Sequence, residues 1–242
     1  MTLLKCSDGL IGDFLGVMPL MADLRAEGPL EIEIHPEAEA LFRLFPKSLD
    51  MRLKRLPDEA YDRVLNLDIS AAFTISHQRN YYMSQAHFAC LGRPVPDVPP
   101  KAALEYSTVE VPVCDYVIAP FSRSLPPQER WPAAQWQDLI DTMPDLQFCL
   151  IGHDRDDPDF VSGPNVTQFF GHPLESLISL LKAARKGLIS IVSGPSHLAF
   201  HLSVPNVLLT NQHMTWGNNP DAIQIWDPIP KLQARDLIPR LP

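Results

Sequence analysis

The chain has 242 residues, 45% of them hydrophobic, and a formal net charge of −9. This length is enough for one large hydrophobic core or two smaller ones. The negative charge argues against nucleic-acid binding, which relies on basic surfaces that displace counterions. The four cysteines form no Cys-x-x-Cys pair, and we interpret them as small buried side chains in a reducing compartment.

The N-terminal stretch is apolar, but it does not have the pattern of a targeting segment. Asp8 and Asp13 interrupt it and no basic segment precedes it, so we expect no signal peptide. Further along, Lys182, Arg185 and Lys186 break the longest apolar run before it reaches membrane-spanning length. These features predict a soluble cytoplasmic protein.

Strand-like and helix-like patterns alternate along most of the chain, which is typical of α/β folds with parallel sheets. In the first half, strands are predicted at residues 2–6, 30–34 and 63–69. A helix should follow the first strand, with Pro19 bending or shortening it, and another helix is expected at residues 36–45.

A proline-dense stretch that begins near residue 92 has no clear period and is predicted to connect two domains. Two α/β domains are therefore expected, residues 1–100 and 101–242, with a cleft between them as a ligand site. In the second domain, strands are predicted at residues 115–121, 146–152 and 187–192, and helices at residues 132–143 and 173–186.

The stretch "GLISIVSGPSHLAFHLSVPNVLL" reads as a buried strand, a small polar turn, a short apolar helix and a second buried strand. Proline is favoured at the first helical position, so Pro195 is predicted there, with Gly194 as the N-cap. The amides of Ser196 and His197 would then lack helical partners. With the hydroxyls of Ser193 and Ser196 and the helix dipole, they would form a site suited to phosphate, which Gly194 lets approach closely. A well-capped helix explains the same residues without a ligand.

Two other interpretations of this turn are excluded. His197 and His201 have the spacing of two metal ligands on one helix face, but Leu198 stands where the zinc-protease pattern needs Glu, and no third ligand is apparent. Leu198 also replaces the second glycine of a Gly-x-Ser-x-Gly nucleophile elbow.

Two further stretches carry polar groups at predicted strand ends. Gly12 and Asp13 follow the first strand, and the Asp13 carboxylate is either a helix N-cap or a base placed to accept a proton from a hydroxyl group. Ser122, Ser124 and Arg130 follow the strand at residues 115–121, where hydroxyl and guanidinium groups suit an anion. A solvated loop anchored by tryptophan is the alternative there.

In this order, the stretches resemble the bacterial heptosyltransferase family, glycosyltransferase family nine. Its members have a loop ending in Gly-Asp before a proline-containing helix, then Lys-x-Trp-Pro, and late in the chain Asp-[Ser/Thr]-Gly-x-x-His-Leu. The matching segments here are "IGDFLGVMPLMADLR", "ERWPAAQW" and "VSGPSHLAFHLSVPNVLL", and "YDRVLNLDIS" is similar to a fourth family segment.

The resemblance implies a GT-B fold, with two Rossmann-like domains facing a cleft: residues 1–100 on the acceptor side and residues 101–242 binding a nucleotide sugar. It implies inverting sugar transfer without metal or other cofactor. The acceptor would be a hydroxyl of a carbohydrate, a lipid-linked molecule or a protein, in cell-surface glycan synthesis. Peripheral contact with the inner membrane surface is a further expectation.

The resemblance also implies roles for individual residues. Asp13, after Gly12, matches the family's proposed base. The "SGPSH" turn matches the segment near the donor's pyrophosphate, where a helix N-terminus would replace a metal in stabilising the leaving diphosphate. Donor and phosphate binding would fall on Ser122, Ser124, Arg130, Ser193, Gly194, Ser196 and His197.

The sequence departs from the family pattern at two positions. Glu129 stands at the place of the family's lysine, and Val192 at the place of its aspartate. These changes imply either a different donor sugar or lost activity. Two alternatives therefore stay open: a non-catalytic relative that binds a nucleotide, a sugar or a protein partner, and another α/β enzyme such as an epimerase of the same fold.

Overall fold

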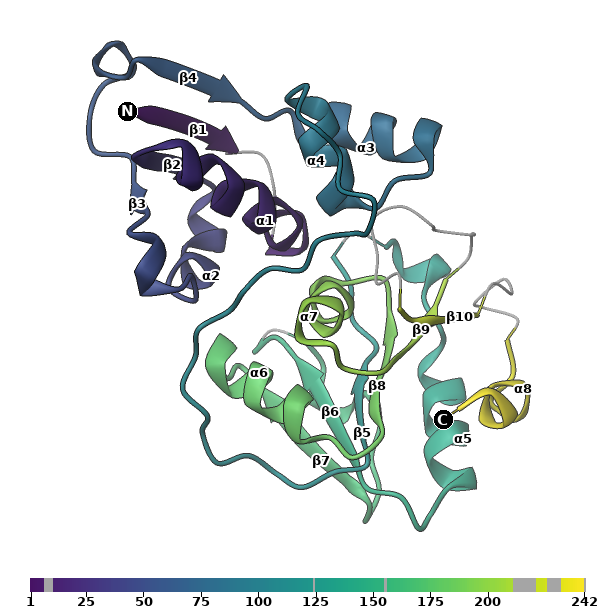
Figure 1. The fold of residues 1–242 in the computed structure, drawn as a ribbon. Helices are drawn as coiled ribbons and strands as arrows, with labels where there is room; N and C mark the ends of the chain where they lie inside the picture. The colour runs from purple at the N-terminus through teal and green to yellow at the C-terminus, as the bar shows by residue number, and fades with distance from the viewer. Residues whose placement is uncertain (7–10, 124, 155, 211–220, 226–231, 242) are drawn as a thin grey trace. The chain divides into compact units, whose positions relative to one another are not determined.

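The computed structural model describes residues 1–242 except 7–10, 124, 155, 211–220, 226–231 and 242. The described residues divide into two compact units, one up to Tyr106 and the other from Ser107 on. Each unit is built around its own sheet, and every strand pair is parallel (Figure 1). The predicted α/β architecture with parallel sheets is confirmed.

The first unit contains a four-stranded sheet in the order β3-β2-β1-β4. Its strands are β1 (Thr2–Cys6), β2 (Leu30–Ile34), β3 (Arg52–Leu53) and β4 (Arg63–Asn66), and its helices are α1 (Ile11–Glu27), α2 (Glu39–Phe42), α3 (Ile69–Arg79) and α4 (Met83–Cys90).

Three expectations for this unit need correction. Helix α1 continues through Pro19, so the shortening expected there does not occur, and a bend at Pro19 stays a prediction. The helix expected at residues 36–45 is a 3-10 turn followed by the short α2. Strand β4 ends earlier than expected because Asp68 accepts a hydrogen bond from the N–H of Ala71 and so caps α3.

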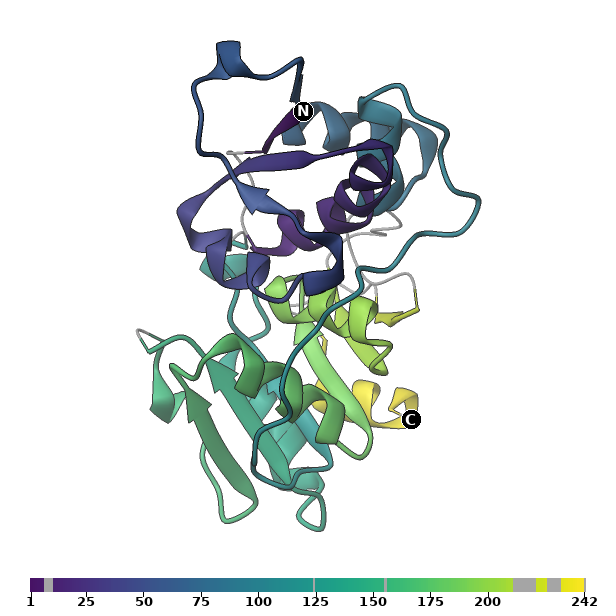
Figure 2. The ribbon, with the colours of Figure 1, turned by 60° about the vertical axis from the view of Figure 1, so that its left-hand side comes forward.

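The second unit contains a six-stranded sheet in the order β10-β9-β8-β5-β6-β7. Helices α5 and α8 lie on one face of it, and α6 and α7 on the other (Figures 1 and 2). The strands are β5 (Tyr116–Ala119), β6 (Phe148–Gly152), β7 (Val166–Phe170), β8 (Gly187–Ile191), β9 (Asn206–Leu209) and β10 (Ile223–Ile225), and the helices are α5 (Ala133–Thr142), α6 (Leu174–Ala183), α7 (Gly194–Leu202) and α8 (Ala234–Leu237).

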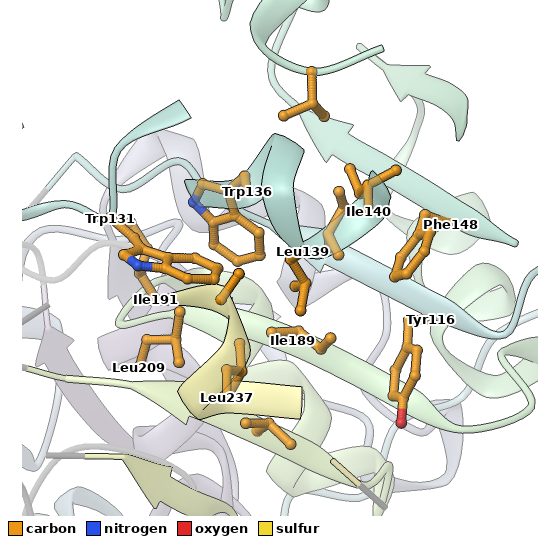
Figure 3. Packing of buried hydrophobic residues seen from close by; sticks show 14 of the residues in the cluster. Tyr116, Trp131, Trp136, Leu139, Ile140, Phe148, Ile189, Ile191, Leu209 and Leu237 are labelled. Carbon is orange, nitrogen blue, oxygen red and sulfur yellow. The ribbon is translucent and has the colours of Figure 1, made fainter. Parts of the chain in front are cut away.

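The core of the second unit lies between its sheet and helices α5 and α8 (Figure 3). Two buried tryptophans close one end of this core, with the rings of Trp131 and Trp136 edge to face and their centroids 4.8 Å apart. The Trp131 indole N–H donates a 2.8 Å hydrogen bond to the carbonyl oxygen of Leu232. The Trp-Pro stretch therefore fastens the start of α5 to the segment that leads into α8.

Within the described ranges, every helix is too short or too polar to cross a lipid bilayer.

The start of β8 depends on a glycine. Gly187 has a φ of +117°, and a Cβ atom built there would lie 2.2 Å from the carbonyl oxygen of Pro205. The N–H of Leu188 donates to the same carbonyl at 2.9 Å, which aligns β8 with β9. Only glycine allows the Pro205 backbone to approach the start of β8 this closely.

We expect Gly187→Ala to lower the free energy of unfolding by about 1–3 kcal/mol, because it combines a strained φ with a clash against backbone. Urea unfolding followed by far-ultraviolet circular dichroism, which reports on the helices of both units, would measure the loss. Gly92→Ala is a suitable control, since Gly92 has a φ of +65° but no atom within 4 Å of a Cβ built there. Equal losses in both variants would contradict a rigid contact with Pro205.

Candidate functional site

The strand order of the second sheet reverses between β5 and β8. From β5 the chain moves outward to β6 and β7, then returns to β8 on the other side of β5 and continues to β9. The loops that leave β5 and β8 therefore diverge at their carboxyl ends, where open parallel sheets bind ligands. Ser122 lies after β5, and the Ser193–His197 turn lies after β8. Two of the predicted stretches thus follow the two strands that flank this switch point.

The first sheet has a switch point between β1 and β4. The chain moves from β1 to β2 and β3, and then returns to β4 on the other side of β1. Helix α1, which carries Gly12 and Asp13, follows β1. The predicted base thus follows one of the two strands that flank this switch point.

Asp13 lies inside α1 rather than at its N-cap. The helix begins at Ile11, which puts Asp13 in the first turn, where its side chain is partly buried. A carboxylate there interacts favourably with the positive end of the helix dipole. The N-cap interpretation of Asp13 is therefore wrong, and its role as a base stays a prediction.

The turn before α7 starts its helix one residue earlier than expected. Ser193 is the N-cap, so Gly194 and Pro195 occupy the first two helical positions. The N–H of Ser193 donates to Ser196 Oγ at 3.2 Å, and Ser196 Oγ donates to the carbonyl of Ser193 at 2.7 Å. Ser193 Oγ donates to the carbonyl of Ile191 at 3.0 Å. Both hydroxyls therefore hold the turn together.

The expectation that the amides of Ser196 and His197 are free is wrong. Because the helix begins earlier, both N–H groups donate to the carbonyl of Ser193, at 3.1 Å and 3.4 Å. Pro195 has no N–H. Among the described amides of the first turn, the N–H of Gly194 takes no part in these hydrogen bonds and could bind a ligand.

His197 does not bring a positive charge to the turn at neutral pH. Burial disfavours its imidazolium form and lowers its pKa to about 4. A neutral imidazole can still donate one hydrogen bond to a phosphate oxygen. Among the described residues, no group of three or more His, Cys, Asp or Glu side chains is arranged to hold a metal ion.

The loop after β5 is held by its own arginine. The Nε–H of Arg130 donates to the carbonyl of Leu125 at 2.8 Å, and the terminal guanidinium nitrogens take no part in this bond. Ser122, three residues after the end of β5, is buried, whereas Glu129 is exposed. Ser124, also predicted to bind the donor, lies outside the described residues.

Sequence reasoning missed several polar residues at the same edge of the second sheet. His153 and Asp154 follow β6 and form an ion pair when the histidine is protonated, and Thr210, buried, follows β9. His172 follows β7 and stacks on Phe169, with ring centroids 3.7 Å apart. Their position in the sequence could have identified them, since each comes just after a strand. The carboxyl ends of parallel strands lie at the same edge of a sheet.

Solved structures with a similar fold are glycosyltransferases. TibC, an iron-containing dodecameric glycosyltransferase from enterotoxigenic E. coli, aligns at 21% identity over 86% of this chain and 57% of its own, with a TM-score of 0.66. A family 9 glycosyltransferase from Veillonella parvula aligns at 14% identity over 99% of this chain and 87% of its own, with a TM-score of 0.70. E. coli heptosyltransferase WaaC with ADP aligns at 14% identity over 99% and 96%, with a TM-score of 0.67.

These similarities define the fold class. The chain has the α/β architecture of the GT-B heptosyltransferases, and the expected likeness to glycosyltransferase family nine is confirmed at the level of fold. It spans about three fifths of the two TibC chains, 57% and 61%. No protein-family model and no curated protein matches the sequence of the chain.

We expect Ser196→Ala to lower the free energy of unfolding by about 0.5–2 kcal/mol, because it removes both hydrogen bonds that close the turn. Thermal or chemical unfolding would measure this loss. Ser162→Ala, at an exposed serine of the same unit, should change stability by less than about 0.5 kcal/mol. Equal stability of the two variants would show that the Ser196 hydroxyl does not hold the turn.

Proposed function

We propose that the protein transfers a sugar from a nucleotide-sugar donor to a hydroxyl acceptor, with Asp13 as the general base. The observation that carries this proposal is that Asp13 and the Ser193–His197 turn each follow a strand that flanks a switch point, in a fold shared with glycosyltransferases. TibC is described in complex with ADP-D-β-D-heptose and WaaC with ADP, which favours an adenine nucleotide as the first donor to test.

In the proposed reaction, the Asp13 carboxylate accepts the proton of the acceptor hydroxyl. The hydroxyl oxygen then forms a bond to the anomeric carbon of the sugar. The bond between that carbon and the diphosphate oxygen breaks, and the nucleoside diphosphate leaves with the electron pair. Attack opposite the leaving group inverts the anomeric centre. This step requires Asp13 to be ionised and within hydrogen-bond reach of the acceptor.

Few groups of the protein would stabilise the leaving diphosphate. They are the N–H of Gly194, the dipole of α7 and the guanidinium of Arg130, with Ser122 and neutral His197 as hydrogen-bond partners. Ser193 and Ser196 would act by holding the turn in shape. Because Glu129 and Val192 add no cation, we expect weaker nucleotide binding than a site with a lysine at position 129 would give.

The rest of the proposal concerns the setting of the reaction. We propose that transfer requires no metal ion and takes place in the cytoplasm. It would serve cell-surface glycan synthesis, at the inner membrane surface, on a carbohydrate, lipid-linked or protein acceptor.

A non-catalytic role is the second candidate, and the turn itself favours it. Two expected phosphate-binding amides are already bonded to Ser193, and an exposed carboxylate, Glu129, takes the place of a cation. Such a protein would bind a nucleotide, a sugar or a protein partner without transfer. Release of nucleoside diphosphate from ADP-heptose in the presence of acceptor glycans would separate the two candidates, since only an enzyme releases it.

We expect Gly194→Val to weaken nucleoside diphosphate binding by about tenfold or more, because its side chain would stand where a phosphate must approach the helix start. The thermal shift produced by a panel of nucleoside diphosphates would measure the change. Gly163→Val, in a loop of the same unit away from this turn, controls for general loss of stability. Unchanged affinity in Gly194→Val would contradict donor binding at this turn.

We expect Asp13→Asn to reduce sugar transfer by about 10²–10⁴-fold while donor affinity stays the same, because the amide cannot accept the hydroxyl proton. Initial rates and nucleotide titrations on the same preparations would measure both. Asp138→Asn, at an exposed carboxylate of α5, should transfer at the parent rate. Parent-rate transfer by a folded Asp13→Asn variant would rule out Asp13 as the base.

A further inference from the structure

A fully buried histidine lies beside the helix that carries Asp13. His87 of α4 is 0% exposed, and neither of its ring nitrogens makes a hydrogen bond of ordinary geometry among the described residues. Burial lowers its pKa to about 4, against the opposing effect of the Gly16 backbone, so the ring is neutral at physiological pH. Buried polar groups without partners are rare in folded proteins and call for an explanation.

The ring of His87 packs against the backbone of α1 at Gly16. A Cβ atom built on Gly16 would lie 3.1 Å from His87 Cε1, 3.5 Å from His87 Nδ1 and 3.5 Å from the Cβ of Met83. Glycine is a poor residue for a helix interior. Here its missing side chain is what lets the ring approach the helix. The two residues therefore form a matched contact between α1 and α4.

This contact lies one helical turn from Asp13. Residues three apart in a helix share a face, so Gly16 is on the same side of α1 as Asp13. Farther along α1, Arg93 binds Asp23 and Glu27, each at 2.6 Å. Helix α1 is thus held by ion pairs toward its C-terminal end and by the His87 ring in its N-terminal half.

We propose that His87 is a positioning residue, whose ring against Gly16 fixes the first turn of α1 and with it the Asp13 carboxylate. This inference rests on the proposed role of Asp13 as the base. Rate depends steeply on such placement, because a shift of about 1 Å in a reacting group costs about 100-fold. If His87 only filled the core, an apolar side chain of similar size would serve at lower cost, since it would bury no polar nitrogen without a well-formed hydrogen bond.

The test changes the contact from both sides. Gly16→Ala adds a methyl group that presses on the ring, and His87→Ala removes the ring. Each variant should lower kcat by about tenfold or more, while the Kd for ADP-heptose stays within about twofold. The double variant Gly16→Ala/His87→Ala should recover kcat to within about threefold of the parent, because the added methyl group occupies part of the vacated space.

A matched control separates positioning from general destabilisation. Phe73 packs at the contact between α3 and α4 and is partly buried, so Phe73→Ala should lower Tm without lowering kcat. The proposal is overturned if both folded single variants keep the parent kcat. It is also overturned if their losses of kcat follow Tm as in Phe73→Ala, or if the double variant is worse than either single one. Should one single variant not fold, the other decides by the same criteria.

A measurement that does not depend on catalysis distinguishes a failure of this inference from a failure of the proposed function. If the parent chain transfers no sugar, the proposed function fails, and the position of Asp13 is read from the ¹³C resonance of its carboxyl group, assigned by its loss in Asp13→Asn. The resonance should move in Gly16→Ala and in His87→Ala and return toward the parent position in the double variant. An unmoved resonance in both single variants would overturn the positioning role.

Discussion

The hydrogen-bonded pairing of β5 with β8 decides where the second unit can bind a ligand. Parallel neighbours cannot be joined by a hairpin, so the chain returns from β7 over one face of the sheet to reach β8. The loops at the carboxyl ends of β5 and β8 then leave toward opposite faces of the sheet, the arrangement at which open parallel sheets commonly bind ligands. Gly187 makes the further pairing of β8 with β9 possible, because it lets the Pro205 carbonyl approach the start of β8.

The turn at the start of α7 is held rigid by its own hydrogen bonds, which occupy groups that could otherwise bind a ligand. Its two serine hydroxyls and the amides of Ser193, Ser196 and His197 are engaged within the turn, and the His197 ring is neutral. A ligand could still use the N–H of Gly194, one hydrogen bond from the neutral His197 ring and the partial positive charge at the helix start. Preorganised dipoles of this kind stabilise developing charge without moving. This would suit the proposed leaving diphosphate, on which negative charge builds up as its bond to the sugar breaks.

Helices and strands were predicted correctly from the sequence where their buried residues follow a simple pattern, and were missed or misplaced where they do not. Strands β1 and β2 have the predicted bounds because buried aliphatic side chains mark each of these short segments. Helix α4 was missed because it buries Ser84, Gln85 and His87, which interrupt any apolar stripe. The start of α7 was off by one residue because Ser193 caps the helix and proline is also tolerated at the second helical position, where its missing N–H leaves no bond unmade. Strand order was beyond prediction, since a sequence pattern encodes burial and not neighbours.

The central claim is that a nucleotide sugar binds at the carboxyl ends of β5 and β8. Hydrogen exchange followed by mass spectrometry, with and without ADP-heptose, tests it most directly, because exchange slows where a ligand covers backbone amides. The account predicts slower exchange in peptides that cover the turn at residues 193–197 and the loop that follows Ala119. Peptides at the opposite edge of the sheet, including the start of β8, should exchange at the unliganded rate. Slowing confined to that opposite edge, or to the first unit alone, would contradict the account.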